Sequence, residues 1–268
     1  SDVYKRQMPG RTFLQHALPI SFGLKCALWL DELVSSHDIL MLRHSDCLQF
    51  GGAVGTLSAL GDAALAVQQH LLVPKHLPPA PNDTRFSFVS VDTPWHTQRS
   101  HEQQVASRLG ILCSSLGKIA RDIALLMQTE VAEVFEPAAP GEGGSSTLPQ
   151  KRNPVQATVI IAIATRTPGL VATMLSAGLQ EHERGVGGWH AEWDTMRELL
   201  TLTGAAAQHM QKLLEGLEVD TARMRANLEL TNGLIMAERV TFALAPKFGK
   251  AKAKAFMKGF GAIVSFEF

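Results

Sequence analysis

One stretch of the sequence gathers several groups that bind negative charge. It reads Gly144-Ser145-Ser146-Thr147-Leu148-Pro149-Gln150-Lys151-Arg152-Asn153-Pro154. The serines supply hydroxyls, Lys151 supplies a fixed positive charge, and Asn153 followed by Pro154 is typical of a helix N-cap and first turn. Because a helix N-terminus attracts anions, the stretch indicates an anion site. A flexible connector before a helix is the simpler interpretation on composition, and the spacing of a phosphate loop is missing.

A second stretch near the start combines a cation, a hydroxyl, an amide and an imidazole. It reads Gly10-Arg11-Thr12-Phe13-Leu14-Gln15-His16-Ala17-Leu18-Pro19. The guanidinium of Arg11 and the hydroxyl of Thr12 suit carboxylate oxygens, and Gln15 could orient them. His16 titrates near neutral pH and is a candidate proton carrier, although a buried, hydrogen-bonded histidine is the commoner explanation for such a residue taken alone.

A third stretch contains residue types that bind metals. His182, Glu183, His190 and Glu192 lie close in sequence, but their spacing matches no familiar zinc pattern. The glycines at 187–188 indicate a turn between two helices. We therefore expect hydrogen bonds at a helix junction or a pocket rim, and no metal.

Long helices must position these groups. Seven apolar residues alternate spacings of four and three, which is a heptad seam: Val105, Leu109, Leu112, Leu116, Ile119, Ile123 and Leu126. We predict a helix over 103–135, roughly 50 Å long at about 1.5 Å per residue. Three glutamates at its end, Glu130, Glu133 and Glu136, are interpreted as a solvated helix face.

Four more helices are expected around this one, over 20–42, 47–71, 153–178 and 189–217. Loops are predicted over 74–94, with a short extended piece at 86–91, and over 137–150. Asp220 predicts an N-cap for a helix over 221–228, and another helix is expected over 234–244. The fold class is therefore all-α, a long-helix bundle with part of a smaller C-terminal helical domain. We assign 1–9 to an atypical tail, 10–217 to the bundle and 218–268 to the partial domain; both ends suggest a truncated or imperfectly assembled reading frame.

Composition excludes some functions. The 25 Lys and Arg balance the 25 Asp and Glu, so net charge indicates no nucleic-acid or membrane partner. Three separate cysteines without paired spacing favour a reduced, cytoplasmic setting, and no signal peptide is recognised. The apolar stretch 155–179 is interrupted by Arg166, Pro168 and threonines, and it is interpreted as a buried bundle helix.

The loop and the first stretch together resemble the fumarase/aspartase superfamily. Residues 144–154 resemble its signature G-S-S-x-M-P-x-K-x-N-P, with Leu148 at the usual methionine, and residues 10–19 resemble its G-R-T-H-x-Q-x-A-x-P segment. Phe13 occupies the usual histidine position and His16 follows three residues later. This arrangement of Phe13 and His16 resembles the lactonising branch of the superfamily, the bacterial 3-carboxymuconate cycloisomerases. Three further segments resemble the same branch: residues 94–99, 127–137 and 181–193. The resemblance covers about 10–244.

This resemblance implies an enzyme that closes 3-carboxy-cis,cis-muconate into 4-carboxymuconolactone, in the protocatechuate branch of the beta-ketoadipate pathway. Lys151, Asn153 and the helix N-terminus would stabilise the carboxylate whose charge rises, while Arg11, Thr12, Gln15 and Ser146 would hold the others. Ser145 would carry the proton to carbon, with His16 as the competing candidate. The resemblance implies no cofactor, a small polycarboxylate substrate, and a homotetramer with shared active sites.

Two alternatives stay open. One is another elimination of the superfamily, such as a fumarate-releasing reaction of the adenylosuccinate lyase type. That substrate would need a phosphate pocket, which the sequence does not reveal. The other is a catalytically incomplete helical scaffold, since the fragment lacks the usual N-terminal domain.

Overall fold

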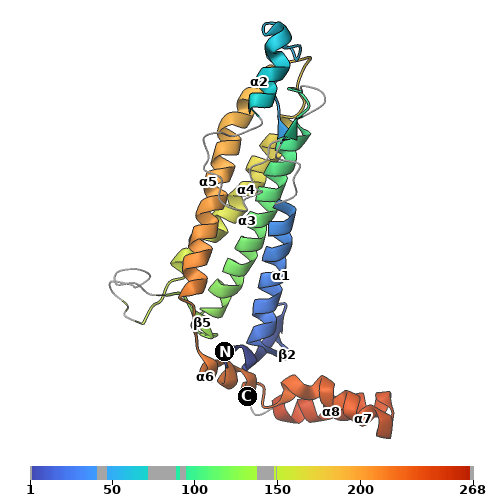
Figure 1. Cartoon of the computed structure of the whole chain (residues 1–268). Coiled ribbons are helices and arrows are strands. Elements are labelled where there is room, and N and C mark those ends of the chain that lie inside the picture. The colour runs from blue at the N-terminus through green and yellow to red at the C-terminus, as the bar shows by residue number, and fades with distance from the viewer. Residues whose placement is uncertain are drawn as a thin grey trace. The chain divides into compact units, whose positions relative to one another are not determined.

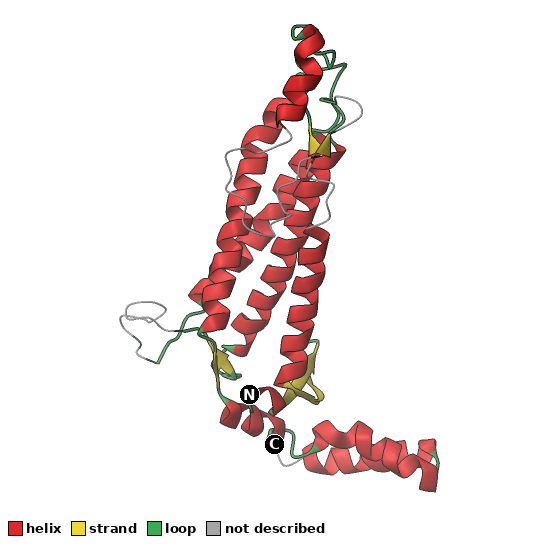
Figure 2. Cartoon of the chain, in the orientation of Figure 1, coloured by secondary structure: helices red, strands yellow, loops and turns green. Residues whose placement is uncertain are grey.

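The helical signal of the sequence becomes a set of long helices in a computed structural model of the chain. The structure describes residues 2–40, 47–71, 89–90, 95–137, 148 and 150–265. Helices dominate this part, and the strands are short (Figure 2). The chain divides into two compact units, residues 1–32, 121–157 and 212–268 in unit 1, and residues 33–120 and 158–211 in unit 2. Unit boundaries fall inside helices, and the domain bounds given above stay a prediction.

Unit 2 is a bundle built on most of α3 (Ser100–Leu126), α4 (Val155–Ser176) and α5 (Gly188–Glu215), with the end of α1 (Phe22–Leu40). The three long helices lie side by side (Figure 1). Its core joins Ala106 and Leu109 to Met174 and Leu199. A Cβ at Gly117 would collide with that of Ala164, so α3 and α4 approach closely where both side chains are small.

Smaller elements complete unit 2 among the described residues. β3 (Cys47–Leu48) pairs in parallel with β4 (Val89–Ser90), and the 3-10 helix η3 (Gly61–Ala63) leads into α2 (Ala64–Leu71). The prediction of one helix over 47–71 is therefore wrong, because glycines at 51, 52, 55 and 61 favour turns there. The extended piece predicted over 86–91 is confirmed at 89–90.

Unit 1 begins with an antiparallel hairpin of β1 (Gln7–Thr12) and β2 (Gln15–Ser21) that leads into α1. β5 (Val134–Phe135) pairs with β6 (Glu218–Val219), which is followed by α6 (Thr221–Glu229). The 3-10 helices η1 (Val3–Lys5) and η5 (Leu234–Met236) and the helices α7 (Ala237–Phe248) and α8 (Lys250–Ser265) complete it. The Asp220 cap is confirmed, because its Oδ1 accepts the Arg223 N–H at 2.8 Å.

The heptad seam is confirmed over most of its length. Leu109, Leu116, Ile119, Ile123 and Leu126 are buried. The helix that carries them ends at Leu126, however, and not at 135. A turn with Ala132 in the left-handed region, at φ 50°, follows and leads into β5. The heptad pattern itself stops at Leu126, so no apolar periodicity supports a helix over 127–135.

One described helix, α4, is long and apolar enough to cross a membrane by length and composition. Ile160, Ile163 and Met174 on this helix are buried in the chain itself. Only 22% of its most apolar window is buried, however. The prediction of a bundle helix agrees with the packing of its inner face, and its other apolar surface is considered below.

Candidate active site

Four of the predicted site residues lie together at the end of the β1–β2 hairpin. Arg11 pairs across the hairpin with His16, and Thr12 pairs with Gln15. The tip between them is Phe13 and Leu14, both in the left-handed region at φ 49° and 64°. Phe13 is fully exposed. The hairpin therefore presents Thr12 and Gln15, which are also exposed, next to a strained apolar turn.

Arg11 does not end in solvent. Its Nη1 and Nη2 donate to Glu133 Oε2 at 2.9 Å and Oε1 at 2.8 Å, and the Glu133 side chain is 0% exposed. Asn227 Nδ2 of α6 donates to Glu133 Oε1 at 2.8 Å. The Arg11 guanidinium, which the sequence predicted to bind substrate, is thus the counter-ion of the buried Glu133 carboxylate. The Glu133 carboxylate requires such a partner because an unpaired buried charge is costly.

His16 is partly buried beside this ion pair. Burial lowers its pKa, the Arg11 charge lowers it further, and the Glu133 charge opposes both effects. The imidazole is therefore held neutral at pH 7. In that form it accepts a proton more readily than it donates one.

The second group of predicted residues lies just before α4. Lys151 is exposed, and Asn153 is half-buried. Arg152 between them is tied inward: its Nη1 donates to Glu218 Oε2 at 2.9 Å, its Nη2 donates to the Glu136 carbonyl at 2.9 Å, and its guanidinium lies 4.4 Å from the Phe135 ring centroid. The hydrogen bond from Arg152 lowers the pKa of Glu218. This anchor fixes the backbone on which Lys151 stands.

The N-terminus of α4 is already occupied by a carboxylate of the chain. The N–H groups of Gln156 and Ala157 donate to Glu136 Oε2 at 2.9 Å and Oε1 at 2.7 Å. Asn153 contributes its backbone carbonyl to the Val155 N–H at 3.0 Å. Glu136 therefore already accepts hydrogen bonds from two amides at this helix end. That Asn153 and the helix N-terminus bind substrate stays a prediction.

The interpretation of the glutamate run as a solvated helix face is also wrong for two of its members. Glu133 is 0% and Glu136 5% exposed, whereas Glu130 is exposed. Helix α3 ends before them, so they follow the geometry of an extended segment. Their partners lie in other elements, and no local pattern in the sequence identified them.

Ser145 and Ser146 lie outside the described residues. Among the predicted site residues that the structure does describe, no hydrogen bond or ion pair links the hairpin group to Lys151 or Asn153. The two groups are instead anchored separately, on Glu133 and Glu136.

The stretch that resembled a metal site lies in unit 2 and is a network of hydrogen bonds. Glu192, 4% exposed, accepts a bidentate pair from Arg99, and Gln180 Nε2 donates to its Oε1 at 3.0 Å. Thr97 Oγ1 donates to the His182 carbonyl at 2.6 Å. No three His, Cys, Asp or Glu side chains gather as possible metal ligands within the described ranges. The helix-junction interpretation thus agrees with the contacts of Glu192 and His182.

A cavity of about 480 Å³ opens beside this network. Trp189 and Trp193 line it together with Arg99 and Glu102. Glu102 Oε2 is buried without a hydrogen-bond partner, and burial raises the pKa of this carboxyl. The cavity therefore has an aromatic wall and one unsatisfied acceptor.

The fold and these charges define a class of protein. Among the described residues, long helices form the bundle of unit 2, and unit 1 holds an exposed lysine before α4 and a hairpin with an imidazole. Such an arrangement suits charge stabilisation and proton transfer on a small acid. A family model described as lyase matches residues 5–169. The chain belongs to this lyase family.

Individual relatives narrow the comparison. The chain is 50% identical over 248 residues to the 3-carboxy-cis,cis-muconate cycloisomerase of Bradyrhizobium diazoefficiens, covering 92% of this chain and 52% of that relative. It is similar to the crystal structure of the 3-carboxy-cis,cis-muconate lactonizing enzyme from Pseudomonas putida, at a TM-score of 0.87 and 45% identity over 99% of this chain and 57% of that one. A class II fumarase from Schistosoma mansoni shares the fold, at a TM-score of 0.75 and 19% identity over 96% and 55%. The chain thus spans about half the length of the relatives it matches.

Proposed function

We propose that this chain is part of a 3-carboxy-cis,cis-muconate cycloisomerase. The observation that carries the proposal is the 50% identity to an enzyme of that name over 92% of the chain. The chain spans about half of that relative, so the activity is proposed for the whole protein and not for this part alone. A polycarboxylate substrate agrees with the exposed Lys151 and with the hydroxyl and amide at the hairpin tip.

In the proposed reaction, one substrate carboxylate adds to a conjugated double bond of the same molecule. A carbon–oxygen bond forms, the π electrons move onto the neighbouring carboxylate, and a proton then reaches the adjacent carbon. No group leaves, so the reaction is an isomerisation apart from proton uptake. Lys151 and Asn153 stabilise the carboxylate that gains charge, and Ser146 helps to hold the others.

The proton is carried by Ser145 or His16. Burial and the Arg11 charge lower the pKa of His16, which favours a proton acceptor over a proton donor at this position. The proposal therefore keeps Ser145 as the first candidate for the donor and His16 as the second. Thr12 and Gln15 hold the remaining carboxylates, while Arg11 acts through Glu133 and not on substrate. No cofactor takes part.

We also propose that the protein assembles as a homotetramer with shared sites, in the cytoplasm. The apolar surface left on α4, with only 22% of its window buried, supports an oligomer, as do the exposed Leu175 and Leu200. Mass measurement in solution tests this: a monomer at micromolar concentration would contradict it.

The activity is tested in a chimera. The matched half of the Bradyrhizobium diazoefficiens relative is replaced by this chain, and loss of the conjugated diene of 3-carboxymuconate is followed by ultraviolet absorbance. We expect lactone formation, abolished by Lys151→Ala and by Ser145→Ala. A folded chimera that converts no diene would contradict the function, and full activity of Ser145→Ala would eliminate the serine role and leave His16.

A further inference from the structure

Side chains of α6 donate hydrogen bonds to the turn that follows α3. Arg223 Nε donates to the Val131 carbonyl at 3.1 Å, and its Nη2 donates to the Glu130 carbonyl at 2.6 Å. Asn227 Nδ2 donates to the Val131 carbonyl at 2.8 Å. The Asp220 N–H donates to the Glu133 carbonyl at 3.0 Å. The helix and its cap therefore fix the backbone on which Glu133 stands.

The Glu133 carboxylate then joins this turn to the hairpin. Both of its oxygens accept from Arg11, and Oε1 accepts a third hydrogen bond from Asn227, which is itself 1% exposed. A bidentate pair fixes the plane of both groups as well as their distance. A small shift of Glu133 would thus move the strand that carries Arg11.

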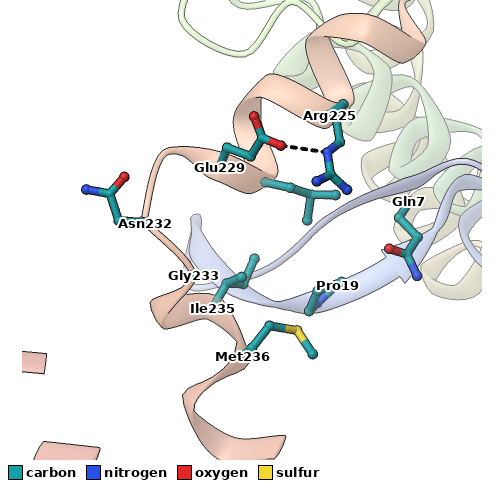
Figure 3. A pocket seen from close by; sticks show the side chains of 9 residues that line it. Gln7, Pro19, Arg225, Glu229, Asn232, Gly233, Ile235 and Met236 are labelled. Carbon is teal, nitrogen blue, oxygen red and sulfur yellow. Dashed lines mark hydrogen bonds and ion pairs between the residues drawn. The ribbon is translucent and has the colours of Figure 1, made fainter. Parts of the chain in front are cut away.

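The hairpin also packs on this side, β1 against α6 and β2 against η5. A two-stranded hairpin is marginally stable alone, and a cavity of about 350 Å³ lies among the packed elements. Figure 3 shows Gln7 and Pro19 of the hairpin facing this cavity, with Arg225 and Glu229 of α6 across it. These two charged groups pair with each other at 2.7 Å, so the side chains across the cavity do not replace the Arg11 link.

We propose that Glu133, held by Asn227, is a positioning residue that sets where the hairpin presents Thr12, Gln15 and His16. Glu133 does not touch substrate in this proposal. The inference rests on the proposed function only for the consequence in catalysis. The contact of Glu133 with Arg11 and Asn227, which we call the Glu133 clamp, is a property of the chain and can be measured without substrate.

The clamp is tested first by NMR on the chain. The titration of His16 and the amide signals of residues 11–16 are compared in the wild type, in Glu133→Gln and in Glu130→Gln. Glu130 is the matched control, because its side chain is exposed in the same turn. In Glu133→Gln the charge that raises the His16 pKa is gone, so this pKa falls whether or not the hairpin moves. The amide signals report the position of the hairpin, and we expect those of residues 11–16 to shift. Unchanged amide signals in folded Glu133→Gln overturn the proposal.

Asn227→Leu is the second variant, in case Glu133→Gln does not fold. It keeps the carboxylate and removes the hydrogen bonds that Asn227 donates to Glu133 and to the Val131 carbonyl. We expect displaced hairpin amides with the Arg11 pair retained. Amide signals identical to the wild type would mean that α6 does not hold the clamp.

Activity is measured in the chimera described above. We expect Glu133→Gln to lower kcat/KM by about 10-fold to 100-fold, with its pH profile displaced in the direction of the His16 titration, while Glu130→Gln is unchanged. Equal kcat/KM in Glu133→Gln and wild type overturns the positioning role. An inactive wild-type chimera with the expected NMR changes instead means that the proposed function fails while the clamp holds.

Discussion

Glu133 and Glu136 are three residues apart, both are buried, and they anchor different parts of unit 1. Glu133 is satisfied by a side-chain cation and an amide, Arg11 and Asn227. Glu136 is satisfied by two backbone N–H groups at the start of α4. Glu133 lies directly before the short strand β5 and Glu136 directly after it. One short segment can therefore hold the hairpin with one carboxylate and the α4 N-terminus with the other.

The two carboxylates differ in which groups lose their hydrogen-bond partner when each glutamate is removed. Removing Glu133 leaves a partly buried guanidinium without a counter-ion. Removing Glu136 leaves two helix amides that water can reach once the first turn frays. The side-chain pair should therefore be the more costly to break, and the backbone cap the more local in its effect.

Glu133→Ala should produce the largest effect. We expect the free energy of unfolding to fall by about 3 kcal/mol, because a buried ion pair loses one partner. Urea denaturation measures this. Replacing both partners, as in Glu133→Leu with Arg11→Met, should recover most of the loss. A double variant no more stable than Glu133→Ala would show that the pair itself, and not the abandoned charge, matters.

Glu136→Ala should cost less, about 2 kcal/mol, since two hydrogen bonds to a helix N-terminus are lost. The loss should be local: the amides of Gln156 and Ala157 should exchange hydrogen faster, while the hairpin amides keep their rates. Hydrogen exchange resolved by residue measures this. Equal acceleration in the hairpin would show that the two anchors are one cooperative unit.

Glu102 contrasts with Glu133 and Glu136, because one buried oxygen of its carboxyl accepts no hydrogen bond. Burial raises its pKa, so the folded chain keeps this proton at a pH where the unfolded chain has released it. Its contribution to stability is therefore full below the ordinary carboxyl pKa and is lost as the pH rises through the raised value. Glu102→Gln should remove this dependence and add about 0.5 to 1 kcal/mol at pH 7. Thermal unfolding from pH 4 to pH 8 tests it, and an unchanged slope would contradict the raised pKa.

The smallest effect is expected at the hairpin tip. Phe13 and Leu14 both have positive φ, which asparagine and glycine adopt at lower cost. Phe13→Asn with Leu14→Gly should stabilise the chain by up to about 1 kcal/mol. If the Glu133 clamp sets the hairpin position, His16 should titrate as in the wild type. A changed titration would assign the positioning to the turn.

Much of the helical architecture could be predicted from the sequence. The seam from Leu109 to Leu126 repeats every three or four residues, and such a period specifies which face of a helix is buried before any partner is known. The Asp220 cap was equally predictable, because its acceptor and the donating N–H lie three residues apart. Contacts of this range depend on local spacing alone.

The site was only partly predictable. Arg11, Thr12, Gln15, His16, Lys151 and Asn153 were identified by their types and by resemblance, but their partners were not. Arg11 pairs with a residue 122 positions away, and an N–H group at the α4 N-terminus donates to Glu136, 20 positions away. Nothing local distinguishes these glutamates from the exposed Glu130.

The sequence by itself determined most of the long helices, the buried face of α3, and which residues are chemically suited to an anionic substrate. Only the tertiary structure decided that Glu133 and Glu136 are buried anchors, and that Arg11 and the α4 N-terminus serve the protein before any ligand. The physical reason is that water solvates a charge at the surface, whereas a buried charge requires a partner within the protein. That partner is chosen by the folded chain as a whole.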